Sequence, residues 1–432
     1  MDAQVKNLEE LIKYENSNGK ITSKLLKYIQ KYHYNFTTYS IFNSDAYKND
    51  KEHIKTIIDL VNHQNREELK KLPILERGSL GSMLGMAIAD AMGHRHEFED
   101  VRYNEITLTD MGYGPGGAFS LLPGQWTDDT SMGLCLADSL IMKKGDYDAH
   151  DLMHRFLCWW NYGYNNAFRH DNSHHHSVGL GGQINGSFWK YIQSPKEETE
   201  NGDKFSSGIG SIMRNAAVPI CYHNDINKAM EIAYRQSKLT HQGDEAAECC
   251  RLLTYIIVKI FKREKKEDEK LKEFLDNNLK DFKILEKSEK YAKSVEYLAS
   301  SKAENKKDSS EPDPDRNWNW KEKDYRYSPS RSKFQPGYIG SYAMDGMAMA
   351  LHVVYYTNSF REAIIKVVNL RGDSDSVGAV VGQIAGAFYG IEDIPSEWIE
   401  TVSKWDDMEI PLRGYVLQKL IPDKGGNKED NQ

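Results

Sequence analysis

The chain of 432 residues carries 56 Lys and Arg against 64 Asp and Glu, a net charge of −8. This balance argues against nucleic acid as the main partner. Residues 1 to 20 are polar and charged without a signal peptide, and no apolar run reaches transmembrane length, so we expect no membrane partner. The five cysteines show neither metal nor disulfide spacing, which fits a reducing, cytoplasmic setting.

Residues 1–72 read as an N-terminal helical extension. Short apolar stripes recur at helical spacing near residues 8–12 and 21–29, and a third helix is predicted over residues 51–71 with Ile54, Ile57, Ile58 and Val61 facing inward. One interpretation is a helical hairpin that packs on the main domain. The alternative is an arm that docks a partner or covers a site.

Two stretches carry small residues at every fourth position. One set is Gly81, Gly85, Ala89 and Gly93, and the other is Gly378, Gly382 and Gly386 in a helix that stops at Gly390. On a helix this spacing leaves one face almost without side chains, so two such helices can approach closely. We therefore predict that these helices pack on each other. Asp90 lies in the first apolar stretch, where a buried carboxylate needs a cation, a metal or backbone donors.

Each of two predicted helix starts carries two aspartates and flanking hydroxyls. The motifs are Thr127-Asp128-Asp129-Thr130 and Asp373-Ser374-Asp375-Ser376. Taken alone, such a motif is explained as a helix cap, because its oxygens accept the free N–H groups of a first turn. Two of them indicate more, since clusters that offer only oxygen suit Mg²⁺ or Mn²⁺, whereas zinc would want His or Cys.

The fold class predicted from these patterns is all-α, with one compact helical domain over residues 73–421. A charged insertion over about 262–335 interrupts it: an exposed helical part over 262–290, then a long loop over 300–335. Trp318 and Trp320 indicate that part of this loop docks on the domain. Residues 422–432 form a polar tail.

Several loops offer groups for a ligand. Glycines cluster at 112–117 and at 179–182, and the run His174-His175-His176 predicts a solvated or substrate-side loop, because adjacent histidines cannot all face one metal. Arg214 follows a glycine-rich turn and could bind a phosphate or carboxylate. The alternative for Arg214 is a structural ion pair.

In this order and spacing the motifs resemble the ADP-ribosylglycohydrolase family over residues 75–395. The family's first helix motif corresponds to Gly81, Gly85, Ala87, Asp90, Ala91, Gly93 and Glu97, with Ala89 where Gly is usual. Thr127–Thr130 match the family's Thr-Asp-Asp-Thr, and Asp373–Ser376 match Asp-x-Asp-Thr with Ser in place of Thr. Met213-Arg214 resembles the family's Asn-Gly-x-x-Met-Arg, with Ile209 where Asn is usual.

The resemblance implies an all-α bundle that holds two Mg²⁺ or Mn²⁺ ions and hydrolyses the bond between ADP-ribose and a protein side chain, most readily arginine. The implied metal ligands are Thr127, Asp128, Asp129, Asp373, Asp375 and Ser376. The candidate general bases are Glu97 and Asp129. The candidate substrate-binding residues are Gly114, Gly116, Gly117, His176, Gly181, Gly182, Gly210, Ser211, Met213 and Arg214.

The implied partner is an ADP-ribosylated protein. The alternative to an enzyme is a scaffold or immunity protein on the same fold, which would recognise ADP-ribosylated targets or block an ADP-ribosyltransferase through residues 1–72. A catalytically dead copy would tend to lose an aspartate of the two motifs, and every such aspartate is present.

Overall fold

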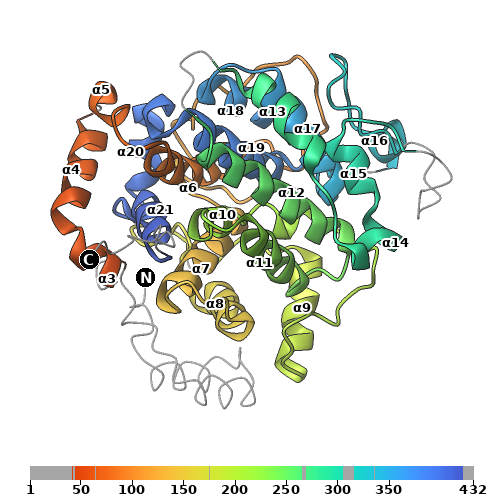
Figure 1. Ribbon diagram of the computed structural model, residues 1–432, viewed down its shortest axis with the longest axis horizontal. Helices are drawn as coiled ribbons and strands as arrows, with labels where there is room; N and C mark the ends of the chain where they lie inside the picture. The colour runs from red at the N-terminus through yellow and green to blue at the C-terminus, as the bar shows by residue number, and fades with distance from the viewer. Residues whose placement is uncertain are drawn as a thin grey trace, which may run out of the picture.

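The computed structural model describes residues 41, 44–63, 65–174, 176–264, 269–304, 316–334 and 336–421. Within these residues the regular structure is helical, and extended segments pair only at isolated bridges (Figure 1). The all-α prediction is confirmed. The stripes expected near 8–12 and 21–29 and the tail from 422 lie outside the described residues.

The helices that build the domain enclose one core. They are α6 (Ile74–Gly93), α7 (Asp128–Met142), α8 (Ala149–Tyr162), α9 (Gly182–Gln193), α10 (Ala217–Cys221), α11 (Ile226–Lys238), α12 (Asp244–Phe261), α17 (Ala343–Tyr355), α18 (Phe360–Val368), α19 (Ser374–Tyr389), α20 (Ser396–Ser403) and α21 (Glu409–Lys419). The N-terminal segment and the charged insertion add α3 (Asp45–Asn49), α4 (Lys51–Asn62), α5 (Arg66–Leu69), α13 (Leu271–Asn278), α14 (Glu289–Ala292), α15 (Ser294–Ala299) and α16 (Pro329–Phe334). None of the helices in the described part has the length and apolar character to cross a membrane.

The centre of the domain is the pair α6 and α19, which confirms the predicted contact between the two small-residue faces. A Cβ on Gly85 would overlap the carbonyl of Gly382, so the two backbones touch there. Ala89 fits between the helices because it faces Gly378. Even a Cβ added to Gly378 would stand 3.4 Å from the Cβ of Ala89, which is an ordinary van der Waals contact. The close approach fixes the register in which the two helices deliver their side chains.

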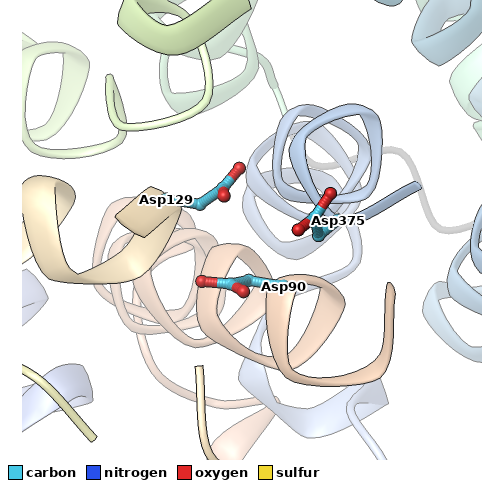
Figure 2. Close-up of side chains that lie close together, drawn as sticks. All are labelled: Asp90, Asp129 and Asp375. Atoms are coloured by element: carbon cyan, nitrogen blue, oxygen red, sulfur yellow. The ribbon is translucent and has the colours of Figure 1, made fainter. Parts of the chain in front are cut away.

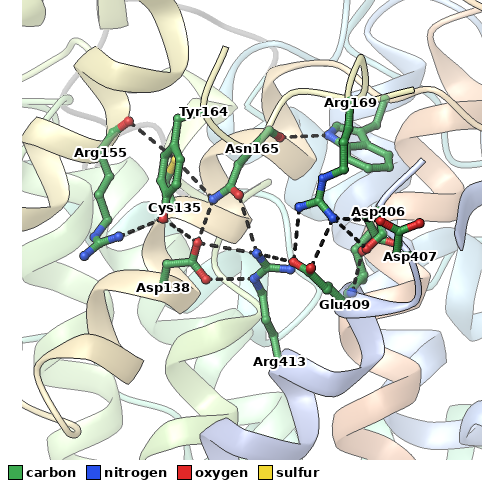
Figure 3. Close-up of polar contacts among 12 residues, drawn as sticks. Cys135, Asp138, Arg155, Tyr164, Asn165, Arg169, Asp406, Asp407, Glu409 and Arg413 are labelled. Atoms are coloured by element: carbon green, nitrogen blue, oxygen red, sulfur yellow. Dashed lines mark hydrogen bonds and ion pairs between the residues drawn. The ribbon is translucent and has the colours of Figure 1, made fainter. Parts of the chain in front are cut away.

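A buried polar network braces α7 against α8 and α21 (Figure 3). Asp138 of α7 accepts hydrogen bonds from Arg413 Nε at 2.8 Å, Tyr164 Oη at 2.6 Å and Asn165 Nδ2 at 2.9 Å. Burial alone would raise the pKa of Asp138, but the Arg413 guanidinium and these donors hold it below its usual value. The network therefore fixes the helix whose first turn carries Asp128 and Asp129.

The N-terminal segment that the structure describes packs on the main domain beside α20 and α21 (Figure 1). Ile54, Ile57 and Val61 are buried as predicted, and His53 Nε2 lies 2.9 Å from Glu76 Oε1. The prediction of a single helix over 51–71 is wrong, because the first helix ends at Asn62 and a second helix, α5, begins at Arg66. For residues 44–69, this is the arrangement expected of a packed module.

The charged insertion is attached more firmly than its composition suggests. Leu271, Phe274 and Leu275 are buried, so the exposed helix expected over 262–290 is wrong for α13, whose apolar residues recur at helical spacing and face the core. Trp318 and Trp320 are fully buried, which confirms the predicted docking of the loop.

Candidate active site

Three chain segments converge at one end of the α6–α19 pair. The last turn of α6 carries Asp90, the first turn of α7 carries Asp129, and the first turn of α19 carries Asp375 (Figure 2). The three carboxylates point toward one another, and each offers an oxygen within 4.8 Å of the others. A second triple of Glu97, Asp373 and Asp375 meets the same distance criterion, so Asp375 joins both groups.

Asp90 has the backbone donors that a buried carboxylate requires. It accepts hydrogen bonds from the backbone N–H groups of Thr127 and Thr130, at 3.0 and 2.9 Å, and from both threonine hydroxyls, at 2.8 and 2.6 Å. Thr127 thus donates its hydroxyl to Asp90 and makes no side-chain cap of its own helix. Asp90 ties the start of α7 to the end of α6.

Other oxygens of this cluster lack hydrogen-bond donors. Asp129 Oδ1 and Glu97 Oε2 are buried without a hydrogen-bond partner. Among the described residues no Lys or Arg forms an ion pair with Asp90, Asp128, Asp129, Asp373, Asp375 or Glu97. Buried carboxylates without donors or counterions are costly, which a helix cap does not explain.

The raised pKa values of these carboxyl groups also indicate that the site lacks positive charge. Burial, then the neighbouring carboxylates, raises the pKa of Asp128, of Asp129 and of Asp375 well above the usual range. Burial raises the pKa of Asp373 to about 6 and that of Glu97 to about 9. A divalent cation would reverse these shifts, because it stabilises the ionised form of each carboxylate.

Glu97 reaches the cluster because its segment pairs with the residues that precede α19. Phe98 N donates to Gly372 O and Gly372 N donates to Glu99 O, both at 3.0 Å. Arg371 and Gly372 have φ values of 63° and 65°, so the chain turns sharply there into α19. The pairing places Glu97 beside Asp373 and Asp375.

The loop before α9 lies against the acid cluster. Gly179 has φ of 90°, and a Cβ on it would overlap the carboxylate of Asp128, so only glycine fits. Gly181 and Gly182, at the start of α9, face open space, while His176 is exposed. Free space at a helix N-terminus beside a site suits a phosphate, so Gly181 and Gly182 remain candidate substrate-binding residues.

The loop at 112–117 encloses a side chain of this protein. Gly112 and Gly116 lie against the guanidinium of Arg95, whose Nη2 donates to Gly114 O at 3.0 Å, and Gly117 lies against His94. Gly114 itself faces open space. The glycines thus make room for Arg95, a cation that the sequence motifs did not single out.

The segment 210–214 forms a buried wall behind the cluster. Arg214 is fully buried and donates to Gln236 Oε1 at 3.0 Å and to Thr240 Oγ1 at 2.8 Å, so the contact with a phosphate or carboxylate expected of it does not fit this geometry. Ser211 shares a hydrogen bond with Ser237 at 2.7 Å. Gly210 and Met213 belong to the same wall, and Met213 Sδ accepts from Ser376 Oγ at 3.6 Å.

Sequence reasoning missed two features of the site. Asp90 was expected to need a partner but not to join the acid cluster, although its position, one helical turn before the end of its helix, was the available signal. Phe98 and Tyr338 stack with ring centroids 5.2 Å apart and remain 37% and 48% exposed. Burial, then the charges of Asp373 and Glu97, raises the pKa of Tyr338, so Tyr338 lies near these carboxylates.

Known proteins of one family resemble this chain over most of its length. The family model of ADP-ribosylglycohydrolase matches residues 72–424. An ADP-ribosylarginine hydrolase, Tri1, of Pseudomonas putida is 29% identical over 75% of this chain and 73% of its own length. The ADP-ribosyl-[dinitrogen reductase] glycohydrolase of Rhodospirillum rubrum is 25% identical over 81% of this chain and 98% of its own.

A solved structure titled as an ADP-ribosylglycohydrolase-related protein complex superposes with a TM-score of 0.56 at 25% identity, covering 80% of this chain and 99% of that one. The family match spans the helices that bring Asp90, Asp129 and Asp375 together. The chain therefore belongs to the ADP-ribosylglycohydrolase family and is a hydrolase of the bond between ADP-ribose and protein.

Proposed function

We propose that this enzyme removes ADP-ribose from arginine side chains and that it requires two divalent cations, Mg²⁺ or Mn²⁺. The observation that carries the metal requirement is the cluster of buried carboxylates around Asp129 and Asp375, which has no Lys or Arg counterion in the described residues and leaves Asp129 Oδ1 and Glu97 Oε2 without a hydrogen-bond donor. Their ligand atoms are all oxygen, as these cations prefer. Relatives named ADP-ribosylarginine hydrolase, from Pseudomonas putida and Serratia proteamaculans, support arginine as the acceptor.

The residues that would hold the cations are Asp128, Asp129, Asp373, Asp375 and Ser376, with Thr127 beside them. When bound, the cations supply polarisation of the ribose hydroxyls and orientation of a water. Asp90 keeps Thr127 in place, since both of its oxygens accept hydrogen bonds from the first turn of α7.

The chain's own carboxylates move the proton. Water attacks the ribose C1″, the bond from C1″ to the acceptor nitrogen breaks, and positive charge spreads over the ribose as in other glycoside hydrolyses. Asp129 or Glu97 takes the proton of the attacking water, because each has a buried oxygen that no donor occupies. The electron pair of the broken bond goes to the guanidine nitrogen, which takes the proton that Asp129 or Glu97 received from the water, so the carboxylate is regenerated.

The exposed aromatic pair Phe98 and Tyr338, near the cluster, supports a guanidinium acceptor. A planar guanidinium stacks on Phe or Tyr, and the acidic cluster behind attracts its positive charge. Tyr338→Ala should therefore raise KM for an arginine-linked substrate more than for a serine-linked one. Equal effects on both substrates would remove this argument for arginine.

The deciding experiment measures release of free ADP-ribose from arginine- and serine-ADP-ribosylated protein, with Mg²⁺, with Mn²⁺ and with chelator. Arginine substrate should be cleaved, and chelator should abolish turnover. Asp129→Asn should lose both metal binding and turnover, whereas Glu97→Gln should bind metal and lose turnover if Glu97 is the base. An inactive wild-type enzyme that binds metal would favour the scaffold alternative instead.

A further inference from the structure

A second cavity lies outside the acid cluster. It has a volume of about 550 Å³ and opens between α17, α18 and the segments 102–106 and 323–326. The clustered acids Asp90, Asp129, Asp373 and Asp375 do not line it. Its volume falls in the range of about 300–1,000 Å³ that small-molecule sites occupy.

The rim of this cavity carries more positive than negative charge. Arg102, Lys323 and Arg326 are exposed, and within the described chain none of them forms an ion pair. Three carboxylates line the same cavity: Glu105 pairs with Arg371 at 2.9 Å, Glu362 accepts from the backbone N–H of Asn358 at 2.8 Å, and Asp324 lies between Lys323 and Arg326 in the chain without an ion pair in the described part. Arg361 and Lys366 also line the cavity, so five cationic side chains stand against three carboxylates. In a chain of net charge −8, this local excess favours an anion.

The floor of the cavity suits a flat ring. Met349, Val353 and Ile365 supply apolar surface, and Tyr103 and Tyr325 supply aromatic surface. A ligand that satisfies both floor and rim must carry an apolar ring system and an anionic group on the same molecule.

One histidine adds a hydrogen-bond acceptor to this floor. His352 Nδ1 lies 2.8 Å from Trp320 O, and since a carbonyl only accepts, Nδ1 carries the hydrogen. Burial lowers the pKa of His352, so the ring is neutral and its Nε2 is an acceptor. An exocyclic amino group, as on adenine, would match that acceptor.

We propose that this cavity binds a nucleoside phosphate, with the base on the floor and the phosphate among Arg102, Lys323 and Arg326. The site is distinct from the one that cleaves ADP-ribose, and the proposal does not depend on the acceptor or the metals assigned above.

The cavity wall is tied to the residues that carry the catalytic acids. Asn369 lines the cavity, and its Oδ1 accepts from the backbone N–H groups of Thr107 and Leu108 at 2.7 and 2.9 Å. Arg102 N donates to Leu370 O at 3.0 Å, and Phe98 N, four residues earlier in the chain, donates to Gly372 O. The cavity wall and the segment of Glu97 therefore belong to one stretch of paired backbone. A bound ligand therefore stabilises the segment that positions Glu97.

The test is titration calorimetry of AMP into the full chain in EDTA, so that metal-dependent binding is absent. AMP should bind, and adenosine or inorganic phosphate alone should each bind at least about tenfold more weakly, because each lacks one half of the contacts. The double variant Lys323→Glu with Arg326→Glu should weaken AMP by about tenfold or more, a loss of about 1.4 kcal/mol. Lys280→Glu with Lys302→Glu, at exposed lysines outside the cavity, is the matched control and should bind AMP as wild type does.

A second measurement locates the ligand without using activity. AMP should slow hydrogen exchange at the Thr107 and Leu108 amides in wild type but not in the double variant. AMP binding that Asp129→Asn abolishes, or that the rim reversal leaves unchanged, would overturn the proposal, as would no binding at millimolar AMP.

Discussion

The contact between α6 and α19 allows a stability prediction with an internal control. In Gly382→Ala the new Cβ would overlap the carbonyl of Gly85, and because the obstacle is backbone, no rotamer change relieves it. Overpacking of this kind costs typically about 1–3 kcal/mol. Taking the upper end and subtracting the gain of about 1 kcal/mol for replacing a helical Gly with Ala, we expect Gly382→Ala to lose about 2 kcal/mol.

The control is Gly378→Ala in the same helix. Its Cβ would meet the Cβ of Ala89 at 3.4 Å, an ordinary contact, so the helix-propensity gain of up to about 1 kcal/mol should survive. The two variants should therefore differ by about 3 kcal/mol in guanidinium unfolding, with unchanged m-values. Gly382→Ala should also bind Mg²⁺ more weakly, because the helices that carry Asp90 and Asp375 must move apart. Equal stability of the two variants would refute the close-packing argument.

Three further predictions concern the site. In metal-free protein burial raises the pKa of Glu97 from its ordinary value of 4.5 to about 9, so between these pH values the native state binds more protons than the unfolded state. The melting temperature in EDTA should therefore fall from pH 5 to pH 9, and Mg²⁺ should restore it. A melting temperature that does not change with pH would contradict the deficit of positive charge at the site. Gly179→Ala forces a left-handed φ and a clash with Asp128; calorimetry should show weaker metal binding and assays lower turnover, whereas Gly114→Ala, which faces open space, should leave metal binding unchanged. Ser376→Ala removes a ligand oxygen and should lower metal affinity several-fold, with partial rescue by excess metal, while Ser376→Thr should keep activity; equal metal titrations for Ala and Thr would exclude Ser376 as a ligand.

The helical class and the central helix pair were predictable because small residues at every fourth position have few other uses. The two acidic motifs were predictable because each carries more carboxylates than a helix cap needs. The meeting of Asp90 with the two motifs was not predictable. Asp90 joins the cluster because the end of α6 contacts the start of α7, and the spacing of residues along the chain does not show this contact.

Other parts depended on contacts that sequence does not show. Arg214 carries the charge that a phosphate site would need, yet its donors are used by Gln236 and Thr240, which lie more than twenty positions further along the chain. The glycines at 112–117 have the composition of a phosphate loop, but they surround Arg95. Composition identifies the groups available for binding, while tertiary contacts decide which of them remain free.

The position of α6 in the chain has a consequence for synthesis. This helix is buried from Glu76 to Gly93, and its partner α19 lies almost at the other end: the hydrogen bond from Ser82 Oγ to Gln383 O spans 301 residues. Until α19 has been made, α6 can contact only helices such as α7 that precede α19 in the chain, and the glycine-rich face that α19 covers stays open to solvent. The core can close only after α19 and α21 have left the exit tunnel, so folding must be a late event. A nascent chain stalled before residue 374 should remain sensitive to protease and should be held by chaperones.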